Sequence, residues 1–87
     1  MTINQIRKKI QSVDMAIIKL LAERKRYVCE IGQLKSKTAQ VIVDPGRERQ
    51  LMSRYALLAK RYQLPIRLVK QLFKLIILYS RGVQQPK

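Results

Sequence analysis

The chain has 87 residues, a length that suits one domain (1–87), and its hydrophobic content of 47% lies well above the range of disordered chains. It carries 19 Lys and Arg against 5 Asp and Glu, and this net charge of +14 favours an anionic partner: nucleic acid, an anionic membrane surface or a small polyanionic substrate. The absence of histidine and the single cysteine, Cys29, exclude an internal disulfide and argue against a metal site, and because no apolar run suits a signal peptide or a membrane span we expect a cytoplasmic protein.

The first predicted element is one long helix over about residues 3–37. Alternating steps of three and four residues from its start meet an apolar side chain at nine of ten positions. These positions are Ile3, Ile6, Ile10, Val13, Ile17, Leu20, Arg24, Tyr27, Ile31 and Leu34. A 3.5-residue period is the pattern of a helix that packs along its whole length.

The length of this helix bears on assembly. A helix over 3–37 spans roughly 50 Å from the rise per residue, whereas a compact globule of this chain length is only about 30 Å across. The helix therefore overhangs any monomeric fold, and its apolar stripe needs a second chain. We expect an intertwined two-fold homodimer in which the long helices pair.

Two shorter helices are predicted after a connection. Residues 41–43 have the composition of a short strand, but no partner strand is found elsewhere. Asp44 is the expected N-cap of a second helix over about 45–62. A short turn and Pro65 then lead into a third helix over about 65–84. The predicted fold is all-α, with three helices per chain and a long first helix.

Three polar residues interrupt the apolar stripes of the three helices: Arg24, Glu48 and Ser80. Because a buried lone charge costs several kcal/mol, such groups must be paired, solvated or in contact with a ligand. One interpretation is structural, with an Arg24–Glu48 salt bridge and with Ser80 hydrogen-bonded back to its own helix. The other interpretation is a functional pocket.

Neighbouring polar residues favour a pocket. Lys35 follows Arg24 by three turns, ~16 Å along the axis and ~20° in azimuth. Arg47 adds a cation at a helix N-terminus, which itself attracts anions, and Gln84 follows Ser80 by one turn. Such a cation-rich pocket suits a small molecule that bears carboxylates. It has no nucleophile–base pair, so chemistry there would depend on positioning and electrostatics.

Five short stretches, taken in order along the chain, resemble the all-helical chorismate mutases, the AroQ class. They are Ile6-Arg7-Lys8-Lys9-Ile10 leading to Asp14, Leu20-Leu21-Ala22-Glu23-Arg24, Ile31-Gly32-Gln33-Leu34-Lys35, Asp44-Pro45-Gly46-Arg47-Glu48-Arg49, and Leu75-Ile76-Ile77 with Ser80 and Gln84. Each stretch alone is weakly specific, but their order and spacing together are specific. The match covers nearly the whole chain, and the family's dimer of three-helix chains agrees with the fold predicted above.

The resemblance implies a Claisen rearrangement of chorismate to prephenate, in phenylalanine and tyrosine biosynthesis, with no cofactor and no metal. The substrate is a dianion. By resemblance, Arg24 binds one of its carboxylates and Arg7, supplied across the dimer interface, binds the other. Ser80 contacts a carboxylate, and Arg47 supports the anionic side of the pocket.

The resemblance assigns the reacting centre to four further residues. Lys35 and Gln84 donate hydrogen bonds to the ether oxygen, where negative charge grows as the C–O bond breaks. Glu48 and the backbone near Asp44 hold the ring hydroxyl. Donors aimed at developing charge stabilise the transition state more than the ground state.

Other functions are weighed against this one. Isochorismate pyruvate lyases share the scaffold, but the Arg47-Glu48 pair and Ser80 favour the mutase. A basic helical nucleic-acid-binding dimer would suit a pI of about 10.7. However, the basic residues are spread around every helix and no recognition motif is present, so we expect neither a nucleic acid nor a membrane as partner. A pure dimerisation module leaves Glu48, Ser80 and Gln84 without a role.

Most of the other lysines and arginines, Arg81 among them, are expected on solvated faces, where they could steer an anionic substrate or mark an acidic partner. No second catalytic or regulatory domain is apparent, so we expect a monofunctional protein.

Overall fold

The computed structural model describes residues 1–38 and 45–84, including the side chains of residues 1–34 and 45–83. Three helices follow one another: α1 (Ile3–Thr38), α2 (Pro45–Arg61) and α3 (Ile66–Gln84). Each helix end lies within one residue of its predicted position. Within the described ranges there is no strand, which confirms the prediction of an all-helical, three-helix chain. The connection, with the strand considered over 41–43 and the N-cap expected at Asp44, lies outside the described residues.

Local sequence explains where the helices begin and end. Thr2 and Gln5 form a capping box. The backbone N–H of Gln5 donates to the Thr2 hydroxyl at 3.2 Å, and the backbone N–H of Thr2 donates to Oε1 of the Gln5 side chain at 2.8 Å. After α2 the chain turns at Gln63, whose φ of 58° is left-handed. The Leu64 amide donates to the Ala59 carbonyl at 2.8 Å and the Gln63 amide to the Lys60 carbonyl at 3.2 Å, which is a Schellman motif.

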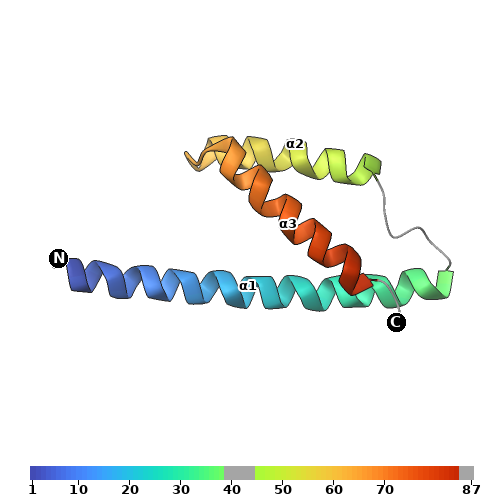
Figure 1. Ribbon diagram of the computed structural model, residues 1–87, viewed down its shortest axis with the longest axis horizontal. Coiled ribbons are helices and arrows are strands. Elements are labelled where there is room, and N and C mark those ends of the chain that lie inside the picture. The colour runs from blue at the N-terminus through green and yellow to red at the C-terminus, as the bar shows by residue number, and fades with distance from the viewer. Residues whose placement is uncertain (39–44, 85–87) are drawn as a thin grey trace.

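The helices form an elongated molecule with extents of 55 × 25 × 15 Å (Figure 1). The long axis is α1 itself. α2 and α3 form an antiparallel hairpin, and α3 crosses from the hairpin turn to the C-terminal half of α1 (Figure 1). Within the described part of the chain, α3 contacts both other helices, whereas α1 and α2 do not contact each other. α3 is therefore the central element, and any site must be built around it.

The core is small and lies on the two sides of α3. Val28, Ala59 and Ile77 are its buried apolar residues. The rings of Tyr55 and Phe73 stack between α2 and α3 with their centroids 4.0 Å apart. None of the three helices is both long enough and apolar enough to cross a membrane.

The apolar stripe of α1 is uncovered in the single chain. Its nine apolar members are 43% to 67% exposed. The total accessible surface is 7639 Å², against about 5,300 Å² for a compact monomer of 10.2 kDa. The radius of gyration is 16.2 Å, against about 12 Å for a compact chain of this length. The three helices therefore leave far more surface in water than a self-sufficient domain does.

Candidate active site

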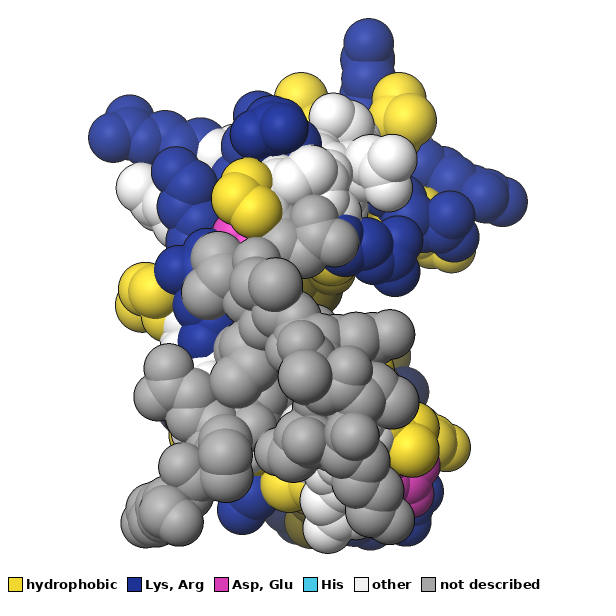
Figure 2. Space-filling model, turned by 90° about the vertical axis from the view of Figure 1, so that its right-hand side faces the viewer, with side chains coloured by type: hydrophobic (Ala, Val, Ile, Leu, Met, Phe, Trp, Pro, Cys, Tyr) yellow, Lys and Arg dark blue, Asp and Glu magenta, His cyan; other side chains and the backbone are white. Residues whose placement is uncertain are grey.

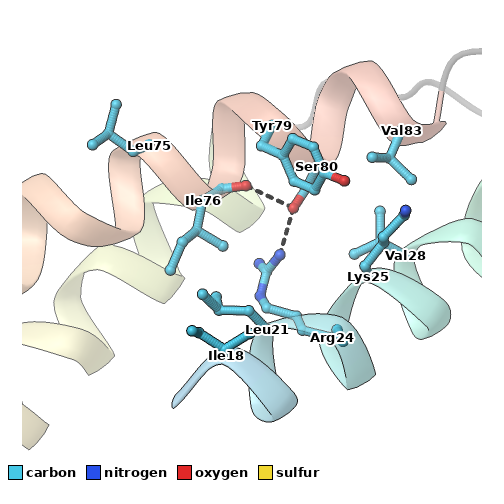
Figure 3. Close-up of a pocket in the computed structure, with 11 residues that line it drawn as sticks. Ile18, Leu21, Arg24, Lys25, Val28, Leu75, Ile76, Tyr79, Ser80 and Val83 are labelled. Carbon is cyan, nitrogen blue, oxygen red and sulfur yellow. Dashed lines mark hydrogen bonds between the residues drawn. The ribbon is translucent and has the colours of Figure 1, made fainter. Parts of the chain in front are cut away.

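A cavity of about 440 Å³ lies between α1 and α3 and is called here the α1–α3 cavity (Figure 3). Most of the side chains that line it are apolar, and among the polar ones are an arginine and a serine. The lining residues are Ile18, Leu21, Ala22, Arg24, Lys25 and Val28 of α1, with Leu75, Ile76, Tyr79, Ser80 and Val83 of α3. Apolar walls with a few polar groups are typical of a small-molecule site.

Arg24 and Ser80, two of the residues that interrupt the stripes, meet in this cavity (Figure 3). Nη1 of Arg24 donates a hydrogen bond to Oγ of Ser80. The Ser80 hydroxyl in turn donates to the Ile76 carbonyl one turn earlier, at 2.7 Å. Ser80 is buried, with an exposed fraction of 7%. Since one Arg24 donor is used by Ser80, the rest of the five guanidinium donors can serve an anion in the cavity.

Glu48 lies on the other side of α3, in a cavity of about 650 Å³ between α2 and α3. Its carboxylate is bound by Arg81, which also lines this α2–α3 cavity. Nε of Arg81 donates to Oε1 at 3.0 Å, and Nη2 donates to Oε2. This ion pair joins the first turn of α2 to the last turn of α3.

The structure corrects two expectations about these charges. The alternative of an Arg24–Glu48 salt bridge is wrong, because Glu48 pairs with Arg81 and Arg24 turns to Ser80. The second part of that structural interpretation, that Ser80 forms a hydrogen bond back to its own helix, is confirmed. Arg81 was expected on a solvated face, and sequence reasoning missed it. Two signals were present: Arg81 follows the buried Ile77 by one turn, and Glu48 is the only acidic residue of α2 and α3.

The remaining candidates are placed as follows. Lys35 lies in the last turns of α1 and Gln84 ends α3, but the side chains of these two residues are not described. Asp44 lies outside the described residues altogether. Arg47 is exposed in the first turn of α2. Arg7 is exposed near the start of α1, and it lies roughly 26 Å from Arg24 along the axis, from the helical rise. Within one chain Arg7 therefore cannot join the other site residues.

The chemistry available at this site is that of fixed charges and hydrogen-bond donors. Around the α1–α3 cavity lie two cationic side chains, Arg24 and Lys25, and the hydroxyl groups of Tyr79 and Ser80. In the described ranges no group of three or more His, Cys, Asp or Glu could hold a metal ion. The positive side chains extend over the upper part of the molecule, formed by α2 and α3 (Figure 2). The whole arrangement therefore attracts an anionic small molecule.

Comparison with known proteins relates this geometry to a family. Residues 6–85 match the family model for chorismate mutase type II. The chain belongs to the chorismate mutase type II family. This confirms the resemblance found in the sequence, and all eight candidate site residues, from Arg7 to Gln84, fall inside the matched range.

Individual relatives point to the same family. The chain is 30% identical over 81 residues to a protein of Methanocaldococcus jannaschii named chorismate mutase, with 93% of this chain and 82% of the relative covered. It is 40% identical over 79 residues to the bifunctional chorismate mutase/prephenate dehydratase of Buchnera aphidicola, with 91% of this chain and 20% of the relative covered. The Escherichia coli protein of that name is 36% identical over 80 residues, at 92% and 21% coverage. The chain thus spans about a fifth of the length of these bifunctional relatives.

Proposed function

We propose that the chain is a chorismate mutase that converts chorismate to prephenate, in phenylalanine and tyrosine biosynthesis, and that residues 1–87 form one catalytic domain. The observation that carries the proposal is the Arg24–Ser80 contact inside the α1–α3 cavity of a member of this family. Chorismate is a dianion, and a partly buried guanidinium oriented by a hydroxyl is a strong carboxylate binder. A cytoplasmic location stays a prediction from the sequence.

The mechanism we propose is positioning with electrostatic stabilisation. The rearrangement is unimolecular: one C–C bond forms as the ether C–O bond breaks, so no proton, electron or leaving group has to be supplied. Arg24 binds a carboxylate and holds the reactive, compact conformer. Lys35 and Gln84 are proposed to donate to the ether oxygen as its negative charge develops, and Glu48 to accept a hydrogen bond from the ring hydroxyl. Arg24 and Glu48 line different cavities on the two sides of α3, so this role of Glu48 requires a substrate that contacts both.

The site is proposed to be completed by a second copy of the chain in a two-fold homodimer. The support is the uncovered stripe of α1 together with the accessible surface, which exceeds that of a compact monomer by about 2,300 Å². Large and apolar interfaces of this kind belong to obligate dimers. Antiparallel pairing of two α1 helices brings the start of one helix toward the C-terminal half of the other, and so carries Arg7 of one protomer to the Arg24 of its partner.

The direct test is the loss of chorismate absorbance with purified protein. We expect turnover by the wild type, and a fall in kcat/KM of at least about 100-fold for Arg24→Ala and for Lys35→Ala. Lys19→Ala, which removes an exposed cation of α1 outside the cavity, serves as the control and should keep its activity. Circular dichroism checks that each variant remains helical.

The outcomes separate the alternatives. Pyruvate release from isochorismate without turnover of chorismate would identify a lyase on this scaffold. Absence of both activities, with binding of duplex DNA that weakens steeply with salt, would identify a nucleic-acid-binding protein. Either result contradicts the proposal.

A further inference from the structure

Arg81 is a charged residue that the roles proposed above leave out. It binds Glu48 through two parallel hydrogen bonds, one to each carboxylate oxygen. A two-point contact of this kind fixes the direction of a carboxylate as well as compensating its charge, which a lysine cannot do to the same degree. Each partner also suits its helix end, with the carboxylate in the first turn of α2 and the guanidinium in the last turn of α3.

Glu48 has a particular need for such a partner. A carboxylate close to a dianionic substrate repels it, and the repulsion grows as the groups leave water. The side chains of Arg81 and Glu48 are 33% and 25% exposed, so the pair is partly removed from solvent and is screened less than a surface pair. The Arg81 guanidinium contacts the Glu48 carboxylate and compensates its negative charge at the carboxylate itself.

The geometry still leaves Glu48 able to bind substrate. An ionised carboxylate offers about four lone-pair directions on its two oxygens. Arg81 uses one direction on each oxygen, so each keeps capacity to accept a hydrogen bond from a hydroxyl. Arg81 thus compensates the charge of Glu48 without blocking it.

We propose that Arg81 is a positioning residue of the mutase site, which holds the Glu48 carboxylate in one orientation and removes its repulsion toward the substrate carboxylates. The proposal rests on the mutase function proposed above. It makes Arg81 act through Glu48 and not by touching the substrate. Because the repulsion acts on the bound substrate and on the transition state alike, its main effect falls on KM.

The experiment is a double-mutant cycle in steady-state kinetics with chorismate. Arg81→Met should raise KM about tenfold, the change that corresponds to ~1.4 kcal/mol of binding, with kcat changed by no more than about threefold. In a Glu48→Gln background the same substitution should change KM by less than about twofold, since no carboxylate is left to compensate. Arg81→Lys, which keeps the charge but loses the two-point contact, should give an intermediate KM.

Controls separate positioning from other roles. Arg67→Met removes an arginine from the opposite end of α3 and should leave KM unchanged, which accounts for the loss of net charge. Thermal unfolding of every variant measures the contribution of the pair to stability. Calorimetric titration with prephenate gives the same comparison of affinities without requiring turnover.

Four results would overturn the proposal. An unchanged KM in Arg81→Met would mean that Arg81 does not affect how Glu48 acts on the substrate. A lowered KM would mean that Arg81 keeps Glu48 from binding the substrate. An equal rise of KM in the Glu48→Gln background would mean that Arg81 contacts the substrate itself. A loss of activity in proportion to the loss of folded protein would mean a structural role only. In each case the wild type still turns over chorismate, whereas a wild type without turnover refutes the mutase function and, with it, this role of Arg81.

Discussion

Mixing two inactive variants should restore activity if each site combines Arg24 of one protomer with Arg7 of its partner. The variants are Arg7→Ala and Arg24→Ala. Arg7 and Arg24 are separated by roughly 26 Å along a single straight helix, from the helical rise, which exceeds the length of an arginine side chain several times. The two side chains can therefore act on one substrate only when they come from different chains.

The magnitude follows from the symmetry of a two-fold dimer. In a heterodimer of the two variants, one site keeps both arginines and the other site loses both. Random pairing makes about half of the dimers heterodimers, so about a quarter of all sites are intact. The mixture should therefore recover about a quarter of the wild-type rate at saturating chorismate, from two proteins that have almost none.

The assay needs exchange of subunits. Equal amounts of the two variants are unfolded together in denaturant, refolded, and followed by loss of chorismate absorbance, with each variant refolded alone for comparison. A matched control mixes Arg24→Ala with Ser80→Ala. Because Arg24 and Ser80 contact each other within one chain, no site in that mixture is intact, and its rate should equal the mean of the two variants alone. If the Arg7→Ala and Arg24→Ala mixture also gives only the mean, Arg7 does not act across a dimer interface.

Two further predictions concern the interface and the cavity. Ile17→Glu places a charge in the α1 stripe of both protomers, at a cost of several kcal/mol each, so sedimentation of this variant should give the mass of the 10.2 kDa monomer. The control Gln11→Glu makes the same change of charge away from the stripe and should leave a dimer. A dimer that persists in Ile17→Glu would contradict the pairing of the α1 stripes. Ser80→Ala should lower kcat/KM about tenfold, because the hydroxyl that orients Arg24 is lost. The free energy of unfolding should change by less than ~1 kcal/mol, because alanine suits the helix and the bond from Ser80 to the Ile76 carbonyl of its own helix adds little stability. Unchanged kinetics would show that Ser80 does not orient Arg24.

The helices could be read from the sequence because their signals are local. Pro45, and Pro65 after a turn at Gln63, each act within a few residues, and the structure places helix ends within one residue of them. The 3.5-residue period of the first stripe also predicted one unbroken helix. Local rules succeed where the interaction partners are neighbours in sequence.

The charge partners could not be read in the same way. The sequence singled out Arg24, Glu48 and Ser80 as misplaced polar residues, and the structure gives each a partner. Which side chains meet, however, depends on how α3 is rotated between the other two helices. That rotation is set by packing between residues far apart in the sequence, such as Tyr55 against Phe73. Pattern reasoning therefore found the residues that need partners, but the pairing it considered for Glu48 in its structural interpretation named the wrong arginine.

The exposed stripe of α1 and the proposed need of the site for a second chain have one physical origin. A chain this short cannot bury both faces of a helix as long as α1, and among the described residues only α3 contacts it, along its C-terminal half. The half that stays uncovered carries Arg7, a proposed substrate ligand that lies roughly 26 Å from Arg24 along the axis. Pairing two chains would cover the stripe and supply the missing cation in the same step. Folding stability, assembly and catalysis would then be linked through one association equilibrium, because whatever separates the chains exposes the stripe and removes Arg7 from the site together.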